Sequence, residues 1–108
     1  MDDLRTERPA DGVARIVLTN AARMNPIAIP MQEQLRDTLL QLRDERAVRA
    51  LILTGEGRGF CAGADLTSVG QGADDGLTRG QRSQQMMRGL SNPLVHLLHE
   101  MPMPVVCA

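Results

Sequence analysis

The spacing of hydrophobic and polar positions changes along this chain, and the changes predict the order of its elements. Residues 13–18 and 50–53 are short runs of mostly aliphatic residues, as expected of buried strands. Between them, apolar residues recur at spacings of four, four and three, which places them on one face of an α-helix: Met31, Leu35, Leu39 and Leu42. A strand, a helix and a second strand in this order predict a crossover between parallel strands.

Two further elements are predicted on the N-terminal side of this unit. Residues 2–8 precede a turn at residues 9–12, where Pro, Asp and Gly favour a tight reversal, so an opening β-hairpin is expected. The helix is expected to begin near Pro30, because proline fits the first turn of a helix, and to end near Arg46.

The C-terminal third predicts a loop, a broken helix and a strand. Residues 68–80 are rich in glycine and should form a surface loop. Residues 81–100 have a helical pattern with an apolar stripe, but Gly89 and Pro93 interrupt it, so we expect a kink or two consecutive helices. Residues 105–108 should form the next buried strand. The chain stops there, and we therefore expect residues 1–108 to be the N-terminal portion of a single, incomplete domain.

Composition excludes several classes of function. The 108 residues are 43% apolar and 23% charged, which suits one small globular domain. Phe60 is the only aromatic residue, so platforms for stacking on bases are missing, and a net charge of −1 gives no bulk attraction to nucleic acid or anionic membrane. All twelve basic residues are Arg, which excludes a lysine nucleophile within this chain.

Targeting and metal-binding signals are also lacking in the sequence. The polar, acidic start does not resemble a signal peptide, and no apolar run approaches membrane-spanning length, so a cytoplasmic protein is expected. Cys61 and Cys107 are too few for a disulfide framework or a zinc site and should be reduced and buried. His96 and His99 have no third ligand at a convincing spacing, so no metal is expected.

A glycine-rich segment follows the second buried strand and carries the candidate chemistry. Four glycines within residues 55–63 predict a loop whose backbone N–H groups face a ligand. A P-loop would need a lysine, and the dinucleotide fingerprint would need a different third spacing. The remaining interpretation is that the amides face a developing oxyanion, followed by a short helix starting near Asp65. Phe60 is expected to anchor the loop in the core.

The same segment carries a family resemblance. Residues 58–66, RGFCAGADL, resemble the signature loop of the crotonase, or enoyl-CoA hydratase/isomerase, family. The resemblance covers nearly the whole chain in the right order, through residues 16–20, Asn25, 35–48, 51–55 and 103–108. It implies an α/β fold, a spiral of β-β-α units that is truncated here after the start of a core strand.

The resemblance also implies acyl-CoA chemistry through an enolate-like thioester intermediate. The backbone N–H of Ala64 would be the first of two oxyanion donors, and Gly63 would let the thioester carbonyl approach. Asp65 suits a helix cap better than a general base. The residues implied to contact substrate and CoA are Arg23, Arg58, Ala62, Gly63, Asp65 and Leu66. Neither a metal nor a cofactor is implied, since coenzyme A is part of the substrate.

Several interpretations stay open at this point. The second oxyanion donor and the catalytic carboxylates are expected beyond Ala108, so the intact parent should be an enzyme, a homotrimer or hexamer, and the chain alone inactive. Hydratase, isomerase, hydrolase and dehalogenase remain possible, and residues 91–95 resemble a branch acting on ring-epoxidised phenylacetyl-CoA. The alternatives are a non-catalytic acyl-CoA-binding or interaction fragment, or a chain with no independent function.

Overall fold

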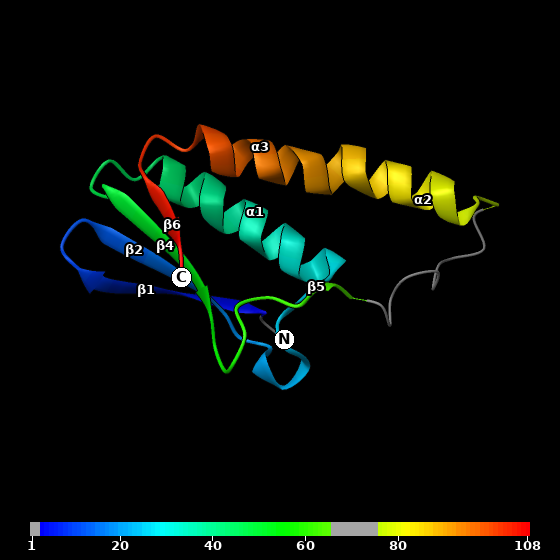
Figure 1. The fold of residues 1–108 in the computed structure, drawn as a ribbon. Helices are drawn as coiled ribbons and strands as arrows, with labels where there is room; N and C mark the ends of the chain where they lie inside the picture. The colour runs from blue at the N-terminus through cyan, green and yellow to red at the C-terminus, as the bar shows by residue number, and fades with distance from the viewer. Residues whose placement is uncertain (1–2, 66–75) are drawn as a thin grey trace.

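The computed structural model describes residues 3–65 and 76–108, and its main element is a four-stranded sheet (Figure 1). The strands lie in the order β1-β2-β4-β6. Their bounds are Leu4–Ala10 for β1, Val13–Leu18 for β2, Ala50–Gly55 for β4 and Val105–Cys107 for β6. The helix α1 (Ile29–Arg43) lies along one face of the sheet, and a second helical run lies beside α1 (Figure 1).

The predicted opening hairpin is confirmed. β1 and β2 are antiparallel, from Leu4 opposite Leu18 to Ala10 opposite Val13. The first strand extends two residues further than predicted, to Ala10, because the register shifts between Glu7 and Ala10. Pro9 lies within that irregularity, which suits a residue that cannot donate a backbone hydrogen bond in an edge strand.

The predicted crossover unit is also confirmed, with one boundary moved. The four residues predicted to share a helix face are all buried in α1, and Pro30 lies in its first turn. α1 ends at Arg43 instead of near Arg46, because the next amides donate three residues back, that of Asp44 to Gln41 and that of Glu45 to Leu42. β2 and β4 are parallel, as predicted.

The C-terminal helical run is continuous and contains a wider turn. It consists of α2 (Arg79–Met86), the π-helical segment η2 (Met87–Ser91) and α3 (Asn92–Glu100). The predicted interruption thus takes the form of a π turn placed just before Pro93, whose ring and missing N–H are incompatible with a regular preceding turn. Most of the predicted loop at residues 68–80 lies outside the described residues.

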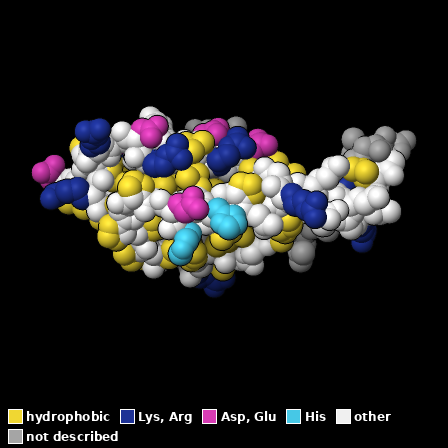
Figure 2. Space-filling view, turned by 90° about the horizontal axis from the view of Figure 1, so that it is seen from above, with side chains coloured by type: hydrophobic (Ala, Val, Ile, Leu, Met, Phe, Trp, Pro, Cys, Tyr) yellow, Lys and Arg dark blue, Asp and Glu magenta, His cyan; other side chains and the backbone are white. Residues whose placement is uncertain are grey.

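The two ends of this run differ in burial. Leu90 and Leu94 are buried, whereas Met87, nearer the start of the run, is 44% exposed. α2 has no buried residue and projects beyond α1 and the sheet, as the narrow end of the molecule in Figure 2 shows. Its start is closed by a capping box, in which Thr78 and Gln81 exchange side-chain-to-backbone hydrogen bonds.

A single hydrophobic core joins the sheet to the helices. Its residues come from β1, β2, β4, α1 and α3 and from the turns beside them, and include Ile16, Leu39, Leu42 and Leu51. The predicted last strand is confirmed as β6, parallel to β4, but the prediction that it is buried is wrong, because it lies at the edge of the sheet and Val106 is 55% exposed. Cys107 is exposed at this edge strand and Cys61 is half-buried, so the prediction that both are buried is wrong. Within the described residues, no helix is long and apolar enough to cross a membrane.

Candidate functional site

A small second sheet lies at one end of the main sheet and forms the frame of the candidate site. β3 (Pro26–Ile27) and β5 (Gly63–Ala64) are parallel, with Pro26 opposite Gly63 and Ile27 opposite Ala64. The segments that contain them follow the C-terminal ends of β2 and β4, which are parallel neighbours in the main sheet. Loops after such ends meet at one edge of a sheet, which is the usual place for a ligand in α/β proteins.

Asn25 holds the glycine-rich loop against this frame. Its backbone is left-handed, with φ +51°, a conformation that asparagine tolerates better than most residues. The side chain is 2% exposed. Its Nδ2 donates to three backbone carbonyls, those of Glu56, Gly59 and Phe60, at 3.0, 3.2 and 3.1 Å. One buried amide therefore fixes the path of residues 56–60.

Gly55 makes this close approach possible. A Cβ at this position would lie 2.3 Å from the carbonyl oxygen of Phe60 and 2.6 Å from Nδ2 of Asn25. The first of these neighbours is backbone and cannot move aside cheaply. Glycine at the end of β4 is therefore required by the packing of the loop on Asn25.

The backbone N–H groups on either side of Gly63 face the same neighbour. The N–H of Ala62 donates to the carbonyl of Met24, and that of Asp65 donates to the carbonyl of Ile27, both at 2.8 Å. Consecutive N–H groups of a regular strand point to opposite sides, so those of Ala62 and Asp65, three residues apart, should face opposite ways. The strand must therefore be irregular between Ala62 and Asp65.

Gly63 provides that irregularity and thereby orients Ala64. Gly63 has φ +100°, which L side chains rarely adopt. Because consecutive N–H groups of an extended strand point to opposite sides, the N–H of Ala64 is expected to point opposite to that of Asp65 and away from β3. Ala64 is exposed, and among the residues that the structure describes nothing lies within 4 Å of where a Cβ of Gly63 would be. The expected result is a backbone donor that faces away from β3 beside a glycine.

Arg23 and Asp65, both predicted to contact CoA, lie against each other. Nη2 of Arg23 is 2.8 Å from Oδ1 of Asp65, and Nη1 is 3.4 Å from Oδ2. The Asp65 side chain is 7% exposed and that of Arg23 is 47% exposed. The helix predicted to begin near Asp65 would fall within residues 66–75, outside the described residues, as does Leu66.

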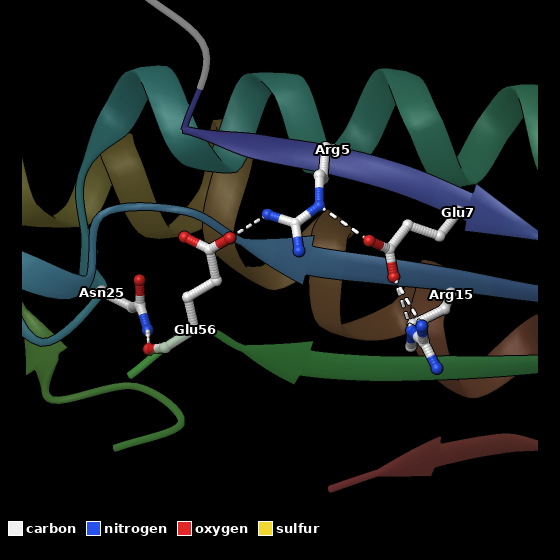
Figure 3. Close-up of polar contacts among 5 residues, drawn as sticks. All are labelled: Arg5, Glu7, Arg15, Asn25 and Glu56. Atoms are coloured by element: carbon white, nitrogen blue, oxygen red, sulfur yellow. Dashed lines mark hydrogen bonds and ion pairs between the residues drawn. The ribbon is translucent and has the colours of Figure 1, made fainter. Parts of the chain in front are cut away.

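A row of charged side chains connects the hairpin to the loop (Figure 3). Glu7 accepts hydrogen bonds from Arg5 at 2.8 Å and from Arg15 at 2.7 Å, and Arg5 also contacts the carboxylate of Glu56. The hydrogen bond from Arg5, followed by that from Arg15, lowers the pKa of Glu7. The carbonyl of Glu56 is one of the three that Asn25 holds, so this surface network reaches the loop.

Sequence reasoning missed the residue that anchors the loop. Phe60 is 39% exposed, so the prediction that it anchors the loop in the core is wrong. Asn25, identified in the sequence only through the family resemblance, does this through polar contacts. The signal available was the asparagine itself in a turn-rich connection, since asparagine tolerates left-handed backbone. Arg58 and Ala62, both predicted to contact CoA, are exposed.

Metal ligands do not converge in the described part of the chain. Within residues 3–65 and 76–108, no group of three His, Cys, Asp or Glu side chains could hold a metal ion. The site thus consists of backbone donors, a glycine with open space around it, and arginine–carboxylate pairs.

Comparison with known proteins identifies the family. The family model described as enoyl-CoA hydratase/isomerase matches residues 8–108. The chain belongs to the enoyl-CoA hydratase/isomerase family. It is 36% identical over 102 residues to 1,2-epoxyphenylacetyl-CoA isomerase of Escherichia coli, covering 90% of this chain and 36% of that protein. It is 34% identical over 103 residues to a probable enoyl-CoA hydratase of Mycobacterium tuberculosis, covering 94% and 36%.

Solved structures of the same family share the fold. A putative enoyl-CoA hydratase from Streptomyces coelicolor superposes with a TM-score of 0.78 at 35% identity, covering 97% of this chain and 37% of that one. An enoyl-CoA hydratase from Bacillus anthracis gives a TM-score of 0.81 at 25% identity, covering 98% and 39%. The predicted family and crotonase fold are confirmed. The chain spans only about 36% of the length of these curated relatives.

Proposed function

We propose that this chain supplies an oxyanion donor and CoA contacts to an acyl-CoA enzyme of the hydratase/isomerase type. The reaction would be hydration of an enoyl-CoA or movement of its double bond, through a thioester enolate. The observation that carries the proposal is the hydrogen bond of the Asp65 N–H to Ile27 just after the left-handed Gly63, which supports an Ala64 N–H that faces away from β3 at an exposed position.

The chemistry needs such a donor. When a proton leaves or a nucleophile adds beside the thioester, negative charge develops on the thioester oxygen, and a fixed N–H stabilises it without reorganisation. Loss of one donor of this kind typically costs about 2.7–4 kcal/mol of barrier. The three hydrogen bonds from Asn25 fix the loop in advance, and the open space beside Gly63 leaves room for the carbonyl.

The proposed CoA contacts lie along the segment around this donor. Residues 62–66 would run beside the pantetheine, and the exposed Arg58 would contact a phosphate, since a guanidinium pairs with phosphate through its planar fork. Of the paired Arg23 and Asp65, only Arg23 has a side chain exposed enough, at 47%, to reach a phosphate.

We place proton transfer on carboxylates outside this chain. We further propose that the intact protein is a homotrimer or hexamer in the cytoplasm. Among the described residues, two carboxylates beside the loop are engaged by arginine side chains, Asp65 by Arg23 and Glu56 by Arg5. This supports the placement of proton transfer outside the chain, because a carboxylate that is paired in this way is not directed at a substrate. The 108-residue chain alone should therefore bind acyl-CoA without turning it over.

Calorimetric titration of the chain with acetoacetyl-CoA and with CoA tests the proposal, together with an assay of crotonyl-CoA hydration. We expect tighter binding of acetoacetyl-CoA, because only this ligand has a thioester oxygen for Ala64, and no hydration. Absence of binding by both ligands would contradict the CoA assignment. Hydration by a verified 108-residue product would contradict the assignment of proton transfer to residues elsewhere. Binding without turnover by every longer product of the gene would favour the acyl-CoA-binding alternative.

A matched pair of variants isolates the donor. Ala64→Pro removes the N–H, whereas Ala64→Ser keeps it and changes an exposed side chain. Hydrogen bonds to charged groups contribute about 1.5–3 kcal/mol, so the proline variant should bind the enolate of acetoacetyl-CoA about 10- to 100-fold more weakly. The serine variant should bind as the unmodified chain does. Equal affinities of the two variants would exclude Ala64 as the donor.

A further inference from the structure

The ion pair between Arg23 and Asp65 lies immediately beside the proposed donor. We infer that these are positioning residues, whose pairing fixes the orientation of the Ala64 N–H, and that their main role is not to bind phosphate. This inference rests on the proposed function, because it concerns the donor assigned there.

The geometry of the pair is restrictive. Two nitrogens of one guanidinium face two oxygens of one carboxylate, Nη2 to Oδ1 at 2.8 Å and Nη1 to Oδ2 at 3.4 Å. Such a fork fixes the plane of the carboxylate as well as its distance. The two residues are 42 positions apart in sequence, so the contact links the segment before β3 to the segment after β5.

Asp65 is bound to the β3 side by its backbone and by its side chain. Its N–H donates to the carbonyl of Ile27 at 2.8 Å, and its carboxylate is held by Arg23. Ala64 lies directly between this doubly held residue and Gly63. The β3–β5 pairing holds Gly63 opposite Pro26, but a glycine at φ +100° gives little conformational restraint of its own, so Asp65 supplies the restraint on the other side of Ala64.

Burial explains why the carboxylate depends on its partner. The Asp65 side chain is 7% exposed, and a buried carboxylate without a counter-charge is strongly unfavourable. Without Arg23, the Asp65 carboxylate would lose the fork that fixes its plane against the β3 side. The peptide that carries the Ala64 N–H would then be held less firmly, although Ala64 itself is unchanged.

The arginine is itself held in a defined turn. Arg23 ends the short 3-10 helix η1 (Ala21–Arg23), and its N–H donates to the carbonyl of Asn20 at 3.1 Å. Met24 and Asn25 follow with positive φ angles of 61° and 51°, and the N–H of Asn25 donates back to Asn20 at 2.9 Å. The guanidinium thus projects from a rigid turn that is fixed to the same loop by Asn25.

Hydrogen exchange of backbone amides provides a test that needs no ligand. We compare Arg23→Gln, Asp65→Asn, the double variant and Arg58→Gln, which removes an exposed arginine of the same loop region. Each change in the pair should accelerate exchange at residue 65 about tenfold or more, while the amide of Leu39 in the core stays protected. The double variant should show no further acceleration. Unchanged exchange at residue 65, or additive effects, would overturn the inference, and Arg58→Gln should leave exchange unchanged.

Binding separates positioning from direct phosphate recognition. If the pair positions the donor, both single variants lose about tenfold in affinity for acetoacetyl-CoA and none for CoA. If Arg23 instead binds phosphate, Arg23→Gln weakens both ligands and Asp65→Asn weakens neither, which would overturn the inference. Should Asp65→Asn fail to fold, Arg23→Lys replaces it, since lysine keeps the charge but lacks the fork. If the unmodified chain binds neither ligand, the proposed function fails, and the exchange result still decides the structural part.

Discussion

Replacing Asn25 by aspartate should destabilise the fold strongly. The two side chains have nearly the same shape, and both tolerate the left-handed backbone found at this position, so Asn25→Asp replaces the donor by a charged acceptor with little change in volume. The new carboxylate would lie where Nδ2 now faces the carbonyl oxygens of Glu56, Gly59 and Phe60. Three attractive contacts would become repulsive ones at a position that is 2% exposed.

The size of the effect follows from burial. Leaving an uncompensated charge in a buried position typically costs about 3–5 kcal/mol, and we expect a loss in this range at neutral pH. Small domains have unfolding free energies of about 5–15 kcal/mol, so this is a large share. Burial and the carbonyl oxygens should raise the pKa of the new carboxyl in the folded state above its unfolded value. The folded state then binds more protons than the unfolded state, so the loss should shrink as pH falls.

Urea denaturation at neutral and at mildly acidic pH measures both parts of this prediction. Asn92→Asp is the control, because it makes the same chemical change at an exposed position and should shift the unfolding free energy little at either pH. A loss below about 1 kcal/mol for Asn25→Asp at neutral pH would refute the argument that Nδ2 organises the loop. A loss that grows on acidification would refute the argument about charge.

Three further predictions concern other parts of the chain. Gly63→Ala should destabilise the fold by about 1–3 kcal/mol because of its φ of +100°, although no described residue lies within 4 Å of the added Cβ. Gly89→Ala, in a helical segment and likewise without a described neighbour within 4 Å, should be neutral or stabilising. Equal effects of the two substitutions in denaturation would contradict this. Glu7 has a lowered pKa, so its contribution to folding stability is present above its unfolded pKa and is lost as pH falls through its folded pKa. Glu7→Gln should therefore flatten the curve of unfolding free energy against pH on the acid side. An unchanged curve would argue against the ion-pair network. Leu39→Ala should lower the free energy of unfolding by about 2–5 kcal/mol, because it leaves a cavity in the core. Val95→Ala, at an exposed position, should shift the denaturation midpoint little. A comparable shift for both variants would be inconsistent with the assigned core.

The elements of the main sheet and α1 could be predicted from the sequence because local spacing decides them. The apolar positions of α1 at helical spacing, and the aliphatic runs of β2 and β4, allow few other arrangements once a crossover is required. The boundary errors were small, since the end of α1 depends on turn bonds that the hydrophobic pattern does not record.

The candidate site could be located from the sequence, but its internal contacts could not. The glycine-rich segment can be predicted because glycines after a strand mark a backbone-lined loop, whereas Ala64 is assigned only through the family resemblance. The contacts of Asn25 with Phe60, and of Arg23 with Asp65, join positions 35 and 42 residues apart, and no local pattern specifies them. Phe60 was misplaced for the same reason: hydrophobicity predicts burial on average, whereas a polar anchor can take over that task.

The order of strands in the main sheet has a consequence for how the chain folds. The β1–β2 ladder joins Ala10 to Val13, the β2–β4 ladder joins Val13 to Ala50, and the β4–β6 ladder joins Leu51 to Val105. From β1–β2 to β2–β4 to β4–β6, each pair of strands encloses a longer stretch of chain than the pair before it, so its formation costs more chain entropy. The hairpin, α1 and β4 should form an early folding nucleus, and β6 should join the sheet last. The loop that presents Ala64 follows β4 directly, so the donor would be assembled on the part of the chain that folds first.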